Sequence, residues 1–163
     1  MDLSSLGLAI AILGGALAAG LAGTGSAIGV ALAGMAASGV ISEDPEKFGP
    51  TLLLVALPGT QGIYGFLVAF LVIMKLGFLG GQVISPSFFE GLQIFGACMP
   101  IALAGFTSAV HQGKVCTAGI GVLAKNPGAA MKALVYGALV ETYAILGLVI
   151  SIFFLQGIKL TAQ

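Results

Sequence analysis

Long apolar segments alternate with short polar stretches along the whole of this 163-residue chain. Each segment exceeds the roughly 20 residues that a helix needs to cross the hydrocarbon of a membrane. Only helices suit such segments, because lipid leaves unpaired backbone groups unsatisfied. The pattern therefore predicts an all-α membrane protein with four transmembrane helices, at about residues 5–41, 48–76, 87–123 and 128–158.

Composition supports an integral, multi-pass membrane protein. The chain is 58% hydrophobic and 7% charged, against about 25% charged residues in a soluble domain. Six lysines balance six acidic residues, and without a basic patch nucleic-acid binding has no support. Cys98 and Cys116 lie in apolar sequence and are expected to be buried. The N-terminus lacks the positive region of a signal peptide, so we expect the first segment to be kept as a span.

An internal repeat divides the chain into two similar halves. Shifting the sequence by 82 residues aligns 12–65 with 94–147 without a gap, and 17 of those 54 positions are identical. Pro45 falls on Pro127 in this alignment, and each proline marks a turn between two apolar segments. The repeat predicts two fused helical hairpins, 1–80 and 81–163, arranged in parallel.

Glu141 is the one acidic residue deep inside an apolar segment. A carboxylate there costs several kcal/mol, which marks it as a functional residue. Gln112 precedes and Glu141 follows the second hairpin turn by nearly the same number of residues, so both lie about 21 Å from that turn at 1.5 Å per residue. In the first hairpin Gly59 occupies the Glu141 position, which places Thr60 and Gln61 at the same depth.

Carboxylate, amide and hydroxyl oxygens in one layer are the ligands that hard cations prefer. Pro58 has no N–H and interrupts helical hydrogen bonding, which frees backbone oxygens beside the layer. Polar side chains in membrane helices also serve simply as hydrogen bonds between helices. Spacing leaves open whether Tyr64 donates to Glu141 or fills a packing gap. For His111, the spacing favours a packing or interfacial role over a role in relaying protons or ions.

Small residues recur at intervals of four in the third segment. They are Gly105, Ala109, Gly113, Thr117 and Gly121. Such spacing lets helix backbones approach closely. Tight packing of one helix layer inside another is suited to a ring of many copies.

Three motifs carry a resemblance to a known family. Leu57-Pro-Gly-Thr-Gln-Gly-Ile-Tyr-Gly-Phe66, His111-Gln-Gly-Lys-Val115 and Val140-Glu-Thr-Tyr-Ala-Ile-Leu-Gly147 resemble the proteolipid (K or c) subunit of bacterial V-type ATPases, most of all the sodium-translocating kind. The likeness covers nearly the whole chain. It implies a rotor ring that turns beside a stator subunit.

The resemblance also implies roles for individual residues. The side chains of Glu141, Gln112, Gln61 and Thr60 and the main-chain oxygen of Leu57 would bind Na⁺. Tyr64 would donate a hydrogen bond to the carboxylate.

Read in this way, the chain is a non-catalytic, ion-translocating subunit without a resident cofactor. Its implied partners are other copies of itself, a stator subunit with an arginine, central-stalk subunits and the lipid of a bacterial plasma membrane. A proton-translocating ring is an alternative. The oxygen-rich layer favours sodium, because a proton needs only Glu141 and one acceptor. A small multidrug exporter is disfavoured because the chain has no tryptophan and three tyrosines. A purely structural four-span protein leaves Glu141 unexplained.

Overall fold

A computed structural model describes residues 3–160, and over that range the protein is helical with no strand. The long helices are α1 (Leu3–Glu43), α2 (Phe48–Ala56), α3 (Thr60–Lys75), α4 (Phe88–Lys125) and α5 (Ala130–Gly157). Short 3₁₀ turns lie at Pro45–Lys47, Leu57–Gly59, Phe78–Gly80 and Pro127–Ala129. The all-α fold predicted from the sequence is confirmed.

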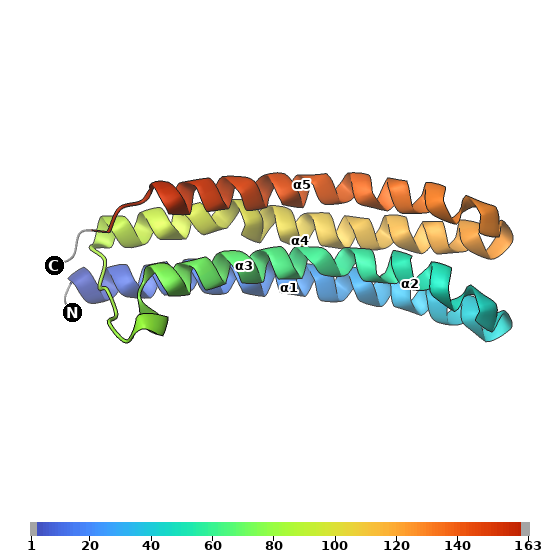
Figure 1. Ribbon diagram of the computed structural model, residues 1–163, viewed down its shortest axis with the longest axis horizontal. Coiled ribbons are helices and arrows are strands. Elements are labelled where there is room, and N and C mark those ends of the chain that lie inside the picture. The colour runs from blue at the N-terminus through green and yellow to red at the C-terminus, as the bar shows by residue number, and fades with distance from the viewer. Residues whose placement is uncertain (1–2, 161–163) are drawn as a thin grey trace.

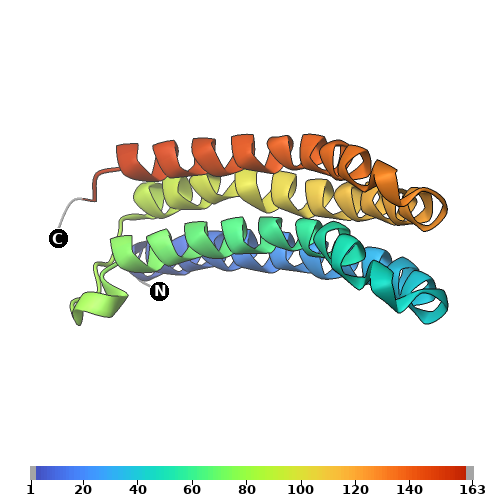
Figure 2. The ribbon, with the colours of Figure 1, turned by 45° about the vertical axis from the view of Figure 1, so that its right-hand side comes forward.

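The helices form two antiparallel hairpins that lie side by side (Figures 1 and 2). α1 pairs with the combined α2–α3 segment, and α4 pairs with α5. The two hairpin turns lie together at one end of the bundle, and the connection between the hairpins lies at the other. Helices from equivalent positions of the repeat therefore run in the same direction, which places equivalent residues at equal depths.

Close contact between α1 and α4 joins the hairpins. A Cβ at Gly25 would lie 2.6 Å from the carbonyl oxygen of Phe106, and one at Gly113 would collide with the backbone of Gly29. Glycine at these positions lets the two backbones touch, as the spacing of small residues predicts. The outer helices α3 and α5 instead carry large exposed apolar side chains.

Pro58 interrupts the second helical segment as expected. The 3₁₀ turn Leu57–Gly59 separates α2 from α3, with Pro58 buried at its centre. Proline has no N–H for the preceding turn and its ring crowds the backbone there. The interruption lies about halfway along the segment, at the depth of the polar residues.

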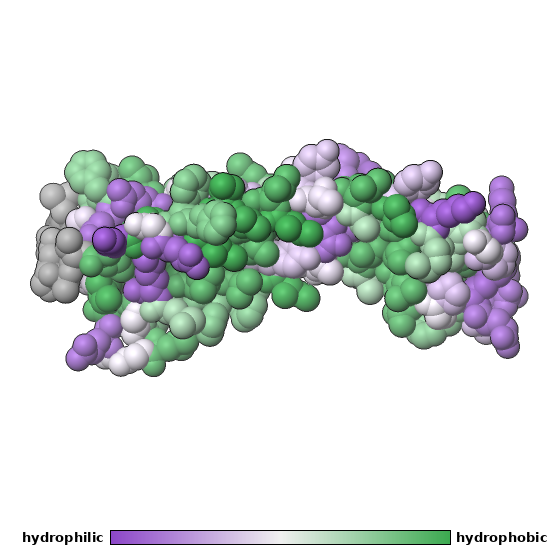
Figure 3. All heavy atoms as spheres, turned by 45° about the horizontal axis from the view of Figure 1, so that its top comes forward, coloured by the Kyte–Doolittle hydropathy of each residue, from purple (hydrophilic) through white to green (hydrophobic). Residues whose placement is uncertain are grey.

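Residues 3–160 contain four helical stretches long and apolar enough to cross a membrane, at Ser5–Glu43, Pro45–Lys75, Phe88–Lys125 and Pro127–Gly157. Apolar side chains cover most of the surface in Figure 3, with hydrophilic residues gathered at the two ends and a further hydrophilic patch between them. Together with the composition, this identifies an integral membrane protein. Cys98 and Cys116 are buried free thiols.

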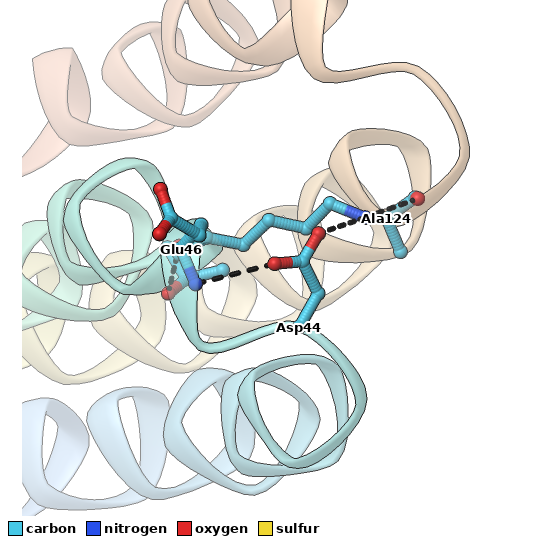
Figure 4. A network of polar contacts seen from close by, with 5 residues as sticks. Asp44, Glu46 and Ala124 are labelled. Carbon is cyan, nitrogen blue, oxygen red and sulfur yellow. Dashed lines mark hydrogen bonds and ion pairs between the residues drawn. The ribbon is translucent and has the colours of Figure 1, made fainter.

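Two sets of polar contacts stabilise helix ends outside the apolar region. At the start of α4, the Ser87 backbone N–H donates to Glu90 Oε2 at 2.7 Å, and the Glu90 N–H donates to Ser87 Oγ. This capping box satisfies two free backbone donors. At the opposite end, Lys47 Nζ donates to the Ala124 carbonyl at 3.1 Å and pairs with Asp44 Oδ2 at 3.3 Å (Figure 4). Lys47 thus links the turn of one hairpin to the end of α4 in the other.

We expect Lys47→Met to lower the free energy of unfolding by about 1 kcal/mol, because a hydrogen bond to the last turn of α4 and a partly exposed ion pair are both lost. Lys132→Met removes the same charge from an exposed position on α5 and is the control. Thermal unfolding followed by circular dichroism in detergent measures both. Equal stability of the two variants would show that the Lys47 link contributes nothing.

Candidate ion-binding site

A polar layer lies where the interruption between α2 and α3 faces α4 and α5. Thr60 and Gln61 begin α3, Gln112 lies in the middle of α4, and Glu141 lies on α5. Three different helices therefore place these side chains at one depth, as the repeat predicts. Within residues 3–160, Glu141 is the one acidic residue in the middle of a helical span, since the others lie at helix ends and turns.

Glu141 accepts two short hydrogen bonds through the same oxygen. Thr60 Oγ1 lies 2.7 Å and the Tyr64 hydroxyl 2.6 Å from Glu141 Oε1. Both donors come from α3, so the first hairpin (α1–α3, hairpin 1) holds the carboxylate of the second (α4–α5, hairpin 2). Tyr64, which spacing left open, is turned toward the carboxylate. Hydrogen bonds to a charged oxygen are about twice as strong as neutral ones.

Thr60 Oγ1 is surrounded by acceptor oxygens. Besides the carboxylate at 2.7 Å, the main-chain oxygen of Leu57 lies at 3.0 Å and Gln61 Oε1 at 3.4 Å. A threonine hydroxyl has one proton to donate, so it satisfies only one of these three acceptors fully. Several oxygen lone pairs therefore converge on one small volume. A hard cation fits such a cluster better than a further hydrogen-bond donor.

Gln61 and Gln112 form the buried floor of the layer. Both are fully buried, and Gln61 Nε2 donates to Gln112 Oε1 at 2.5 Å. Gln112 Nε2 in turn donates to the Gly137 carbonyl at 2.9 Å. The described hydrogen bonds of Gln112 go to these two partners, so it joins the oxygen cluster through Gln61. This chain of amides orients the Gln61 oxygen toward Thr60.

Two serines that sequence reasoning did not select lie beside this layer. Ser108 donates to the Val140 carbonyl at 2.8 Å and accepts a long bond from Gln61 Nε2, and Ser26 accepts the Gly62 N–H at 2.8 Å. Ser26 and Ser108 are identical positions of the 82-residue repeat. The identity of a polar residue at equivalent positions of both hairpins is the signal that could have found them.

His111 lies outside the site. It is exposed on α4, and its Nδ1 lies 2.7 Å from the Thr107 carbonyl of the preceding turn. No group of three or more His, Cys, Asp or Glu residues gathers anywhere in the described range. The candidate ligands are therefore oxygens, with one carboxylate to balance one positive charge.

Comparison with known proteins relates the chain to one family. The model of the family described as the C subunit of ATP synthase matches residues 13–72 and again 95–154. The two matches begin 82 residues apart and end 82 residues apart. Each hairpin is thus a separate copy of the same family unit, which confirms the period of the repeat.

Three relatives illustrate this similarity. The K subunit of the V-type sodium ATPase of Enterococcus hirae is 48% identical over 145 residues, covering 89% of each chain. The K subunit of the A-type ATP synthase of Methanocaldococcus jannaschii is 41% identical, covering 93% of this chain and 64% of its own. The 16 kDa proteolipid of the V-type proton ATPase of Nephrops norvegicus is 26% identical over 87% of each.

The amide pair provides a test of the layer as a hydrogen-bonded unit. Gln112→Leu leaves the fully buried Gln61 amide without its short acceptor, and Gln61→Leu leaves Gln112 Oε1 without its donor, so each should cost about 1–3 kcal/mol of stability. The double variant removes both partners and should cost less than the sum. Thermal unfolding in sodium-free buffer separates this from ion binding. Strictly additive losses would show that the pair is not coupled.

Proposed function

The chain belongs to the family of the ATP synthase C subunit, and on this ground we propose that it is a rotor-ring subunit of a V-type ATPase that carries Na⁺ across the membrane. The cluster of oxygens around Glu141 and Thr60 is the observation that carries the choice of ion. The sodium ATPase relative from Enterococcus hirae, 48% identical, supports the same choice. ATP hydrolysis belongs to a peripheral complex, so this subunit is non-catalytic.

The proposed ligands are oxygens from three helices. Glu141 supplies the negative charge, while Thr60 Oγ1, the main-chain oxygen of Leu57 and Gln61 Oε1 lie around one another, with Thr60 Oγ1 within 3.4 Å of each of the others. Tyr64 holds Glu141 Oε1 at 2.6 Å and leaves the second carboxylate oxygen to the ion. Na⁺ would enter with the Thr60 hydroxyl proton turned away from it.

Gln112 takes a double role in this proposal. Its Oε1 already accepts the hydrogen bond of Gln61 at 2.5 Å. An amide oxygen has two lone pairs, so it can keep this bond and coordinate the ion with the other. Gln112 thereby holds Gln61 in place and completes the ligand set at the level of α4.

Transport follows from the cost of a bare carboxylate. Glu141 faces hydrocarbon as the ring turns, and an unoccupied charge there costs several kcal/mol. The site therefore rotates through lipid only when an ion or a proton neutralises it. At the stator subunit an aqueous path and the stator arginine release the ion. Moving one charge across 100 mV takes about 2.3 kcal/mol, so one ATP can drive several ions.

The proposed assembly has four kinds of partner. Other copies of the chain complete the ring, and a stator membrane subunit supplies the arginine. Central-stalk subunits couple the ring to ATP hydrolysis, and lipid covers the outer helices in a bacterial plasma membrane. Family membership favours this assembly over the multidrug exporter, which the composition already disfavoured.

A proton ring is the second candidate. The Nephrops norvegicus relative belongs to a proton ATPase, at 26% identity. A proton on Glu141 would need only one acceptor, and the buried Gln61–Gln112 pair would then have no part in binding. The sodium proposal accounts for these oxygens, whereas the proton alternative does not.

Carbodiimide labelling separates the two ions. The reagent modifies a protonated carboxyl group, so Na⁺ bound at Glu141 should slow labelling at fixed pH, while choline at the same ionic strength should not. Glu141→Gln should remain unlabelled and identifies the reacting residue. Labelling that is unaffected by Na⁺ would exclude the sodium site and leave the proton ring.

Tyr64→Phe should raise the Na⁺ concentration needed for half protection by roughly tenfold or more. A hydrogen bond to a charged group contributes about 1.5–3 kcal/mol, and about 1.4 kcal/mol corresponds to a factor of ten. Tyr136→Phe, at an exposed position of α5, is the matched control. Unchanged protection in Tyr64→Phe would show that the phenol does not orient the carboxylate.

A further inference from the structure

An open apolar groove runs along hairpin 1 between α1 and α3. Its volume is about 430 Å³, and Gly15, Ala16 and Ala19 of α1 and Ile73 of α3 are among its lining residues. It lies away from hairpin 2. Gly14 contacts Phe95 of α4, whereas Ala16 two residues later is exposed.

The same groove exists in hairpin 2, where it is filled. The residues 82 positions after its lining are Ala97, Cys98, Ile101 and Leu155. All four are buried in the main core cluster between the hairpins. The side chains of α3 that belong to this cluster are Tyr64, Val68, Leu71 and Val72. The filled groove is thus a template for the occupant of the open one.

Applying the same shift to the last three of these α3 side chains gives a ridge on α5. Val68, Leu71 and Val72 become Ile150, Phe153 and Phe154. These last three residues are 42%, 62% and 54% exposed in the single chain. One edge of the protein therefore carries an open groove and the opposite edge an unpartnered ridge of the same origin.

Side-chain sizes have changed together on the two edges. In the groove, Ala19 stands where Ile101 stands in the template, and Gly15 and Ala16 replace Ala97 and Cys98. On the ridge, phenylalanine stands where the template has leucine and valine. Smaller residues in the groove accompany larger ones on the ridge, which conserves the packed volume as a well-packed interface requires.

The distance between the α1 and α4 backbones must also differ between the contact within a chain and the contact between copies. A Cβ at Gly29 would collide with the Ala109 carbonyl across the α1–α4 contact, but the repeat places His111 at the Gly29 position. A contact between α4 of one copy and α1 of the next must therefore be wider than the contact within a chain. The counterparts of Ala109 and Gly113 on α1 are Ala27 and Ala31, and both are exposed.

We infer that neighbouring copies join by seating Ile150, Phe153 and Phe154 of one copy in the Gly15–Ala16–Ala19 groove of the next. The exposed His111 fills the wider space between α4 and the neighbouring α1. Because groove and ridge lie on opposite edges, the contact is head to tail, and it closes into a ring when the rotation per copy allows. The inference rests on the proposed rotor function, which requires copies side by side.

Disulfide trapping tests the contact directly. In a Cys98→Ala, Cys116→Ala background, Ala16→Cys combined with Phe154→Cys should form a ladder of chain multiples after oxidation in membranes. The ladder should collapse to single chains on reduction. Each single-cysteine variant should stay at one chain length, because equivalent positions do not meet in a head-to-tail contact.

Native mass measurement of the same detergent-extracted samples separates two failures. An intact ring without a ladder would overturn the inferred contact and leave the rotor function standing. The unaltered chain extracted as single copies would overturn the rotor function itself.

A matched pair of isoleucines on α5 repeats the test with the native cysteines in place. Ile150 and Ile145 are both 42% exposed in the single chain. The counterpart of Ile150 is the fully buried Val68, whereas that of Ile145 is the 65%-exposed Ile63. Ile150→Ala should shift dissociation of the ring in detergent to lower temperature, and Ile145→Ala should not. Equal effects of the two variants would show that Ile150 has no contact that Ile145 lacks, and would overturn the inference.

Discussion

The cost of a carboxylate in hydrocarbon is the constraint on which the rest of this structure depends. Glu141 lies in the middle of a membrane-spanning helix, where water cannot solvate it. Thr60 and Tyr64 supply two short hydrogen bonds from the other hairpin, and an ion or a proton must supply the remaining charge. The two hairpins therefore have to be held at a fixed depth and orientation, because a slip of one turn would leave the charge without partners.

The fold meets this requirement with rigid inner helices and an interrupted outer one. Glycine at Gly25, Gly29 and Gly113 allows α1 and α4 to touch along their backbones, so the hairpins cannot slide past each other without a clash. Pro58 opens the α2–α3 segment and leaves the Leu57 oxygen beside the Thr60 hydroxyl. Close packing of α1 against α4 fixes the position of the two hairpins, and the interruption at Pro58 exposes a main-chain oxygen to the site.

Duplication explains why a single charge serves two hairpins. Both halves match the same family unit, yet Gly59 stands in the first where Glu141 stands in the second. Divergence of the halves lets each residue specialise: the second hairpin brings the carboxylate and the first brings the donors. In the proposed rotor, one carboxylate per pair of hairpins halves the number of ions moved per turn relative to one per hairpin. The energy available per ion rises accordingly.

The sequence by itself determined the four spans, the repeat and the depth of the polar layer. These depend on hydrophobic length, on helical rise and on the positions of Pro45, Pro127 and Glu141, all of which are local properties of the chain. Only the tertiary structure decided which polar groups touch. Tyr64 turns to the carboxylate, Gln112 joins the cluster through Gln61, and Ser108 joins the layer, because rotation of each helix about its axis is fixed by packing against its neighbours. Packing between helices is a property of pairs of distant segments, and spacing along one segment does not contain it.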